Sequence, residues 1–514
     1  MQLVWFKHDL RISDHDPLSF AMRDGMAILL YILEPELWKQ PDLSFRHYDF
    51  LGRSLSALEE DLEKKGHKLL IRVGGAVEIL KELCIRHNVK KIYSYNETWN
   101  GWTRKRDAKV REWVNASPVK WIELQHNGVI SNLSKRDGWS SLWYKEMRKP
   151  ITHLPVKSDT LNIESQDLPT SDSLGLKHDG IGKLMKAGSD EAGKLLDSFI
   201  EKRGRRYTFE MSSPLTAPTA CSRLSNHFSY GSFSIRQAFQ TVTKAAKSLN
   251  HFPVEDRSIW TSSFRSFQSR LRWHCHFIQK LEDEMSIEFE SLHPDLVGLR
   301  EESVNEEFLE RWKLGLTGYP MIDACMRSLI STGWLNFRMR AMLVSFASYH
   351  LWIHWRPLSV YLANLFLDYE PGIHYSQVQM QSGTTGINAV RIYNPIKQSM
   401  DHDPTGAFIR RWVPELQDVG SDWIHEPWKM DASQQQNAQV KIGDTYPAPL
   451  TEHSPSVKLA RAKMADVFHR KGFREASKAV YEKLGSRRRQ PKRSGRSQKV
   501  KRADKPNSQL SLFV

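Results

Sequence analysis

The first 130 residues alternate between short apolar runs and longer amphipathic segments. An apolar run bounded by turn residues is typical of a buried strand, whereas apolar side chains three or four positions apart are typical of a helix. The expected strands are Leu3–Phe6, Met26–Leu33, Lys68–Val73, Lys91–Tyr95 and Val119–Leu124, and the expected helices are Phe45–Lys64, Ala76–Arg86 and Thr103–Val114. Strands that alternate with helices form right-handed βαβ units, so the pattern predicts a doubly wound α/β domain with a parallel sheet over residues 1–130.

The pattern changes twice after this domain. Pro, Ser, Asp, Gly and Lys dominate from Lys149 to Gly188 without clear periodicity, which predicts an interdomain connector over residues 131–197. From Ser198 the pattern is helical and rich in aromatic residues, notably in Phe264–Glu284, Tyr319–Ser331, Phe337–Ile353 and Leu358–Leu367. We therefore expect an all-α domain with room for a cofactor over residues 198–484, followed by a disordered tail over residues 485–514.

Composition places the chain among large globular proteins. At 514 residues it is too long for a single core, and 40% apolar residues with 17 Trp and 22 Phe are enough to build large cores. Lys7, Asp9 and Arg11 stand where a signal peptide needs its apolar segment, and no apolar run approaches membrane-spanning length. We expect a cytoplasmic protein with no membrane segment.

The cysteines and glycines exclude several common sites. Cys84, Cys221, Cys275 and Cys325 are far apart and form no CxxC pair, so we expect reduced, mostly buried thiols and no metal site. No GxGxxG or GxxxxGK[ST] motif follows an expected strand, and this argues against a dinucleotide or P-loop site of the usual kind.

Positive charge is concentrated near the C-terminal end. The net charge is +15, and the segment from Ser486 to Lys505 supplies +9 of it, with ten Lys or Arg against Asp504. Such a segment is either a solvated disordered tail or a tether attracted to nucleic-acid phosphates.

Two runs in the helical part carry the most specific motifs. They are TGYPMIDACMRSLISTGWLNFRMR, from Thr317 to Arg340, and the run from Trp355 to Leu416, which contains DYEPGIHYSQVQM. Both resemble the flavin-binding core of the cryptochrome/photolyase family, and WFKHDLR, from Trp5 to Arg11, is similar to the opening strand and turn of that family's antenna domain. The resemblance implies FAD held in a bowl of helices, and electron transfer driven by blue light.

The resemblance also implies which residues hold the FAD. Asp368 and Glu370 match the acidic pair that faces the flavin ring and adenine, and Arg340 matches the arginine paired with the first of them. Ser222–Ser225 and Ser234–Gln237 resemble the segments whose hydroxyls and amides hold the phosphates, in keeping with anion binding at helix N-termini. The full implied set is Tyr207, Cys221, Ser222, Arg223, Leu224, Ser225, Phe337, Arg340, Asp368 and Glu370.

The family's lesion pocket is altered in this chain. Photolyases for cyclobutane dimers have a Glu three residues before a lesion-stacking Trp; Trp273 is kept here, but Arg270 replaces the Glu. Phe337 replaces an Asn that touches flavin and lesion, and Met380 replaces a second Trp. The adjacent histidines used for (6-4) photoproducts are also missing, since those positions are Asn336 and Phe337. Neither standard pocket is intact, and we expect Trp273 and Arg270 to contact the lesion.

The residues that feed the electron differ as well. His374 matches the position opposite flavin N5, where it either titrates near neutral pH and controls flavin protonation or is a buried core histidine. Of the three tryptophans that commonly relay electrons, Trp355 matches the middle one, whereas Val378 and Glu302 occupy the flavin-proximal and surface positions. Other routes stay open through Trp352, Trp334, Trp312, Tyr361 and Tyr375.

The chain ends in SQLSLFV, which contains a short linear motif. Gln509, Leu510, Leu512 and Phe513 match the pentapeptide by which bacterial proteins bind the replication sliding clamp. The match predicts a clamp partner and a bacterial source; the alternative is an apolar chain end without a partner.

These features together predict a blue-light-dependent flavoenzyme similar to DNA photolyase, a carbon–carbon lyase. Reduced FAD would give an electron to a pyrimidine lesion flipped out of DNA. One alternative is a cryptochrome-type photoreceptor without repair activity, and another is a clamp-associated DNA-binding protein that keeps FAD only structurally. We expect a monomer, and the sequence leaves open a second antenna chromophore, folate or deazaflavin.

Overall fold

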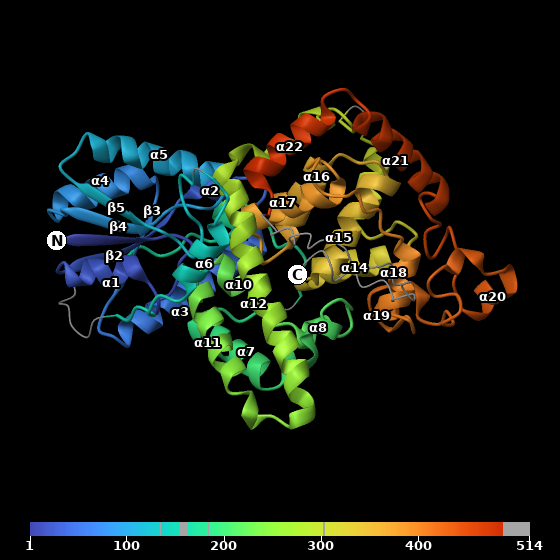
Figure 1. Cartoon of the computed structure of the whole chain (residues 1–514), viewed down its shortest axis with the longest axis horizontal. Helices are drawn as coiled ribbons and strands as arrows, with labels where there is room; N and C mark the ends of the chain where they lie inside the picture. Colours follow the sequence, from blue (N-terminus) through green and yellow to red (C-terminus); the bar gives the residue numbers. More distant parts are fainter. Residues whose placement is uncertain (134, 155–162, 183–184, 302–303, 487–514) are drawn as a thin grey trace, which may run out of the picture.

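The computed structural model describes residues 1–133, 135–154, 163–182, 185–301 and 304–486. Within them, the chain forms an N-terminal α/β part and a larger helical part, with helix α12 (Val254–Asp283) running between the two in Figure 1. The motif Gln509–Phe513 and the relay position Glu302 lie outside the described residues, so the predictions made for them stay predictions.

The α/β part is built on a parallel sheet in the order β3-β2-β1-β4-β5. Its strands are β1 (Gln2–Phe6), β2 (Ala27–Leu33), β3 (Leu69–Val73), β4 (Lys91–Tyr95) and β5 (Lys120–Leu124). All neighbouring strands pair in parallel, and Leu3 of β1 is in register with Ile28 of β2 and Ile92 of β4. The predicted doubly wound domain is confirmed, with strand ends within one residue of those expected.

Side chains of the central strands alternate between two cores because successive residues point to opposite faces. Val4 and Phe6 pack in the cluster that contains residues of α1 (Asp16–Arg23) and α3 (Phe45–Glu63). Leu3 and Trp5 pack in the cluster of α4 (Ala76–Arg86) and α5 (Gly101–Asn115). Figure 1 shows these helix pairs on opposite faces of the sheet.

The helical part follows the periodicity of the sequence closely. The expected Phe337–Ile353 helix is α15 as far as Ser345 and then a π-helical turn, Phe346–His350. Among the described residues no helix is both long and apolar enough to cross a lipid bilayer. The remaining helices are α2 (Pro35–Trp38), α6 (Trp139–Met147), α7 (Ser189–Glu201), α8 (Tyr207–Glu210), α9 (Ala217–Ala220), α10 (Ser225–Ser229), α11 (Ile235–Lys247), α13 (Glu306–Lys313), α14 (Pro320–Thr332), α15 (Phe337–Ser345), α16 (Trp355–Leu365), α17 (Pro371–Ser382), α18 (Pro395–His402), α19 (Ala407–Trp412), α20 (Ala432–Asn437), α21 (His453–Phe468) and α22 (Phe473–Leu484).

The described residues of the predicted connector include helix α6 and most of helix α7. Trp143 of α6 and Phe199 of α7 pack in one cluster with Phe264 of α12, so both helices contribute to the helical core. Between them the chain crosses to the α/β part, where the backbone N–H of Gln166 donates to the Ile71 carbonyl at 3.1 Å. The domain boundaries at 130 and 197 stay predictions.

The side chain of Arg46 connects the α/β part to the helical part through hydrogen bonds. Its side chain is fully buried, and Nε donates to Asp179 at 2.7 Å. Its Nη1 and Nη2 donate to the carbonyls of Leu365 (2.8 Å) and Ile330 (2.9 Å), near the C-terminal ends of α16 and α14. A cation at these ends satisfies carbonyls that the helices leave free and complements their dipoles.

We predict that Arg46→Met lowers the free energy of unfolding by about 3–5 kcal/mol, because it leaves a carboxylate and several carbonyls without their buried donor. Urea unfolding of the full chain measures this. The control is Lys39→Ala, which removes an exposed ion pair with Glu36 and should change stability by less than about 1 kcal/mol. Equal effects from the two variants would contradict the role given to Arg46.

Candidate active site

The centre of the site is an ion pair between the buried carboxylate of Asp368 and the half-buried guanidinium of Arg340. Arg340, on α15, donates from Nη1 and Nη2 to the two oxygens of Asp368 at 3.0 and 2.9 Å. Burial works to raise the pKa of Asp368, but Arg340 and a hydrogen bond from Ser225 outweigh it and hold that pKa below its usual value. Asp368 is therefore charged at neutral pH, and it can accept N–H groups of a ligand.

The turn before α10 brings further groups to this pair. Ser225 is the first residue of α10, and Leu224 before it is fully buried. Arg223 has a φ of 66°, a left-handed conformation that is unusual for a side chain of this size. Its guanidinium lies 3.8 Å from the centroid of the Trp334 ring, and burial lowers its pKa to about 10. Arg223 thus remains a half-buried cation beside Asp368, as an anionic ligand would require.

Cys221, Ser222 and Tyr207 lie around the same turn. Arg203 donates to the backbone carbonyls of Cys221 and Ser222, which fixes the path of the chain into the turn. Tyr207, at the start of α8, is buried, which raises its pKa to about 12, and its hydroxyl is hydrogen-bonded to Arg270. The structure therefore gathers most of the residues implied for FAD.

The side chains of the segment Ser234–Gln237 connect the two parts of the chain. Ser234 caps α11 and donates from Oγ to Asp14 of the α/β part at 2.5 Å. Arg236 binds Asp14 and Asp16, and reaches Glu146 on α6. That this segment holds FAD phosphates stays a prediction.

Buried polar atoms beside the site test whether FAD fits. Among the described residues, Thr208 Oγ1, Asn226 Oδ1 and Glu370 Oε1 are buried without a hydrogen-bond partner. Such atoms cost free energy unless a ligand or water satisfies them. Burial raises the pKa of Glu370 to about 8, with a further increase from nearby Glu97, so this carboxyl is largely neutral at pH 7. A charged Asp368, a cationic Arg223 and a neutral Glu370 fit the ring, phosphates and adenine of FAD.

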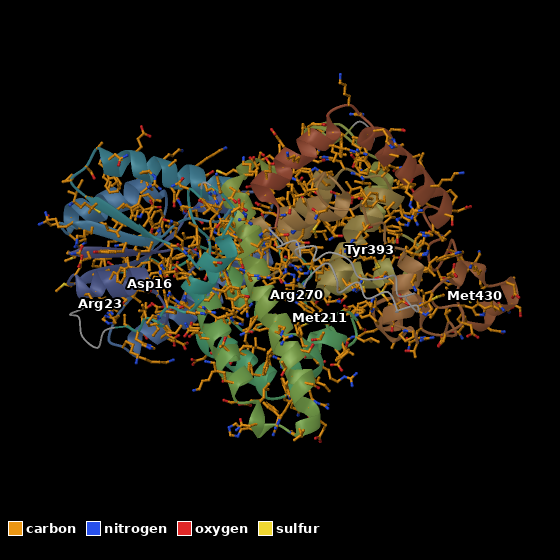
Figure 2. All side chains as sticks on the ribbon, viewed as in Figure 1. Asp16, Arg23, Met211, Arg270, Tyr393 and Met430 are labelled. Atoms are coloured by element: carbon orange, nitrogen blue, oxygen red, sulfur yellow. The ribbon has the colours of Figure 1, made fainter. Side chains whose placement is uncertain are left out.

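The lesion-pocket candidates come together where α8 meets α12. Arg270 and Trp273 are one turn apart on α12, and the Trp273 ring stacks on Phe277 with centroids 5.5 Å apart. Arg270 Nη2 lies 4.0 Å from the sulfur of Met211, and Figure 2 shows these two side chains beside each other. Phe337, the first residue of α15, is 40% exposed. The start of α15 and this stretch of α12 thus present a cation and aromatic rings where the photolyase pattern has a carboxylate.

His374 is buried on α17, and its surroundings bear on the two alternatives that the sequence left open, titration near neutral pH or a buried core histidine. Its Nε2 bonds the Ser359 carbonyl at 2.8 Å. Burial lowers the pKa of His374 to about 4, so the ring is neutral at physiological pH. The suggestion that His374 titrates near neutral pH is therefore wrong, whereas its place opposite the flavin stays a prediction.

Trp355 is fully buried and has limited aromatic contacts. Its Nε1–H donates to Ser291 Oγ at 3.1 Å, and its ring lies edge-to-face with Tyr375 at 6.5 Å. Trp312 packs instead against Tyr361. Tyr375 in turn lies 6.3 Å from Tyr369, a residue that sequence reasoning did not single out.

Two cavities open at the carboxyl ends of the strands, next to the switch in strand order between β1 and β4, where ligands bind in doubly wound folds. One is lined by His8, Glu97, His274 and Glu370. The other is lined by Trp5, Trp38, Trp99, Tyr31 and Arg106 among others. Residues of the WFKHDLR motif line both cavities, and Glu370 lines the first.

The neutral form of Glu370 predicts a pH dependence of stability in protein without bound cofactor. Between pH 4.5 and 8 the folded state binds more protons at this group than the unfolded state, so stability falls as pH rises. Glu370→Gln should flatten this slope and exceed wild type at pH 8 by roughly 2–4 kcal/mol. Urea unfolding at pH 5 and pH 8 measures the difference, with exposed Glu36→Gln as control. Parallel slopes for wild type and Glu370→Gln would refute the assignment.

Comparisons with known proteins agree with this geometry. Residues 2–136 match the DNA photolyase family model, and residues 267–466 match the model of the FAD binding domain of DNA photolyase. A deoxyribodipyrimidine photo-lyase of Alkalihalophilus pseudofirmus is 26% identical, covering 90% of this chain and 97% of its own. The crystal structure of a Synechocystis cryptochrome superposes with a TM-score of 0.80 at 23% identity, covering 90% of this chain and 98% of its own. That of an archaeal photolyase from Sulfolobus tokodaii with two FAD molecules gives a TM-score of 0.73 at 24% identity, covering 91% of this chain and 100% of its own. The chain belongs to the cryptochrome/photolyase family.

Proposed function

We propose that this protein is a blue-light-dependent DNA-repair flavoenzyme that acts on a pyrimidine lesion. The observation that carries the proposal is the Asp368–Arg340 ion pair with Ser225 and Arg223 beside it, together with Arg270 and Trp273 on α12. The similarity to a deoxyribodipyrimidine photo-lyase over 90% of the chain supports the same function.

Each side chain of the site has a defined task in this proposal. Bound FAD supplies one-electron chemistry when it absorbs blue light. Asp368 accepts N–H groups of the flavin ring, and Arg340 balances negative charge on that ring. Arg223 pairs with phosphate, and the neutral carboxyl of Glu370 bonds the adenine.

Recognition of the lesion falls to Trp273 and Arg270 of α12. Trp273 stacks on the flipped bases, which is worth about 1–3 kcal/mol per base for aromatic side chains. Arg270 donates to carbonyl or phosphate oxygens of the lesion, whereas a Glu at this place would accept from its N–H groups. The change from a negative to a positive side chain favours a lesion other than the standard dimers, or a dimer in single-stranded DNA.

The altered pocket also favours a second candidate, a cryptochrome-type photoreceptor without repair activity. Light would then change the redox state of the flavin, and a partner surface would respond to it. The likeness to the Synechocystis cryptochrome is one of fold alone and supports either function equally.

The cavity lined by Trp5, Trp38, Trp99, Tyr31 and Arg106 supports a second chromophore. Its aromatic side chains suit a flat ring system. We infer that an antenna chromophore, a folate or a deazaflavin, binds there.

The remaining partners rest on sequence alone. The basic segment Ser486–Lys505 supports attraction to DNA, and Gln509–Phe513 supports binding of the bacterial sliding clamp. We infer a cytoplasmic monomer that works on DNA near replication sites. Loss of clamp binding on deletion of the last six residues would test the motif.

Repair itself is tested by illuminating the reduced protein with oligonucleotides that carry one defined lesion, in single- and double-stranded form. We expect restored pyrimidines for at least one lesion, and roughly tenfold weaker binding of that oligonucleotide by Trp273→Ala. Chromatography of the digested oligonucleotide measures the first and fluorescence anisotropy the second. Bound FAD with a light-driven spectral change, yet no restoration of any lesion, would favour the photoreceptor instead.

FAD binding is tested by Asp368→Asn, which keeps the shape of the side chain and removes its charge. We expect a roughly 10- to 100-fold loss of FAD affinity, because a charge-assisted hydrogen bond to the ring is lost. Glu415→Gln is the matched control, since Glu415 accepts from Arg327 through both oxygens, at 2.9 and 2.8 Å, in a pair away from the site. Unchanged affinity in Asp368→Asn would place the flavin elsewhere.

A further inference from the structure

Asp42, Tyr369 and Tyr375 form a buried cluster across the domain interface. Tyr369 donates its hydroxyl to Asp42 Oδ2 at 2.5 Å, and Tyr375 approaches the same oxygen at 3.4 Å. Asp42 is 3% exposed and the two tyrosines are no more so. A short bond from a phenol to a carboxylate is a geometry in which the proton can move to the carboxylate when the phenol becomes acidic.

The carboxylate comes from the α/β part and is held in place by backbone contacts. Asp42 lies in the turn between α2 and α3. Its neighbour Pro41 accepts from Asn364 Nδ2 at 2.7 Å, and Ser44 Oγ donates to the Asn364 carbonyl at 2.7 Å. The two parts of the chain are thus locked within a few residues of the Tyr369–Asp42 bond.

Tyr369 also lies beside the candidate flavin site. It follows Asp368 directly in the chain, and its ring is edge-to-face with His374 at 5.3 Å. With Val378 at the flavin-proximal relay position, Tyr369 is an oxidisable ring close to both Asp368 and the residue aligned opposite flavin N5.

The rings of Tyr375 and Trp355 are less suited to giving up an electron. The Arg356 guanidinium lies 5.1 Å from the centroid of Tyr375 and 6.0 Å from that of Trp355. A nearby cation disfavours a positive charge on either ring. The N–H of Trp355 donates to the Ser291 hydroxyl, which is a poor base, whereas Tyr369 faces a carboxylate.

We propose that Tyr369 is the electron donor of this protein and that Asp42 is the base that accepts its proton. The inference rests on the proposed function, because the oxidant is a light-excited, oxidised flavin. Tyr369 loses one electron to that flavin and its hydroxyl proton to Asp42. The products are a neutral tyrosyl radical, a protonated Asp42 carboxyl and a flavin reduced by one electron. Transfer of the proton back to the oxygen accompanies the return of the electron.

The resting state is consistent with this assignment. Burial, and then the Asp42 carboxylate, raise the pKa of Tyr369 well above its usual value, so the phenol is protonated in the dark. Oxidation makes loss of the hydroxyl proton favourable, since a phenol that has lost an electron is a strong acid. The same carboxylate that opposes ionisation in the dark therefore traps the oxidised state.

The test is flash photolysis of the full-length protein loaded with oxidised FAD, followed by transient absorption and by electron paramagnetic resonance of illuminated, frozen samples. We expect a long-lived neutral tyrosyl radical that is absent in Tyr369→Phe. Asp42→Asn keeps a hydrogen-bond acceptor but cannot take the proton, and should slow radical formation roughly 10²-fold, the low end of the effect of a positioned base. Radical formation in the wild type should also be slower in D₂O.

Two control variants test whether the radical signal belongs to the Tyr369–Asp42 pair and not to another tyrosine. Tyr361→Phe removes a tyrosine whose hydroxyl donates to the Lys313 carbonyl at 2.8 Å, and Tyr375→Phe leaves the Tyr369–Asp42 bond in place. Both should retain the tyrosyl signal. If Asp42→Asn fails to fold, Tyr369→Phe still decides. A tyrosyl radical that persists in Tyr369→Phe, or a tryptophanyl radical alone in the wild type, overturns the inference. Lesion repair without a tyrosyl radical overturns the inference only, whereas a protein that binds no FAD overturns the proposed function as well.

Discussion

The site depends on one buried guanidinium, that of Arg46. Taking a charge out of water is costly, and the cost is offset here because every nitrogen of the group finds an acceptor: Asp179 from the connector and carbonyls at the ends of α14 and α16. Neighbouring His47 bonds the Phe366 carbonyl at 2.9 Å in the same way. The segment that follows α16 leads directly to Asp368, so the position of the central carboxylate is set by contacts that the α/β part supplies.

Two carboxyl groups only two positions apart then take opposite protonation states. Asp368 is held charged because Arg340 and Ser225 both stabilise the anion. Glu370 points towards the domain interface, where burial and the nearby Glu97 favour its neutral form. Environment, not residue type, assigns these roles. The charged carboxyl can accept from the ring of a ligand, while the neutral one can donate to its adenine. These different capacities follow from the different surroundings of the two side chains in the segment between α16 and α17.

Local patterns were enough to predict the fold. The strands β1 to β5 and helix α4 differ from their predicted bounds by one residue or less, because apolar runs and amphipathic periodicity report burial directly. The implied ion pair of Arg340 with Asp368 is also present. The sequence could not distinguish Ser222–Ser225 from Ser234–Gln237, since both have the composition of a helix start. Only the position of Asp14, more than two hundred residues away in the chain, shows that Ser234 docks a domain. The pKa of His374 was likewise beyond the sequence, because it depends on burial and on the Ser359 carbonyl.

The departures from the photolyase pattern are connected through the interface. Val378 of α17 matches the position where the family pattern has its flavin-proximal relay tryptophan. The same helix carries Tyr375 and the segment before it carries Tyr369, and both hydroxyls are hydrogen-bonded to Asp42. A tryptophan relay works by passing charge outward to solvent, whereas a tyrosine beside a base retains the oxidised state by losing a proton locally. The second arrangement needs no exposed terminal ring, but it does need a carboxylate fixed at hydrogen-bonding distance. In this chain that carboxylate belongs to the other domain. Under the proposal that Asp42 takes the proton of Tyr369, the α/β part supplies the base, and the packing that Arg46 maintains sets the distance over which the proton moves.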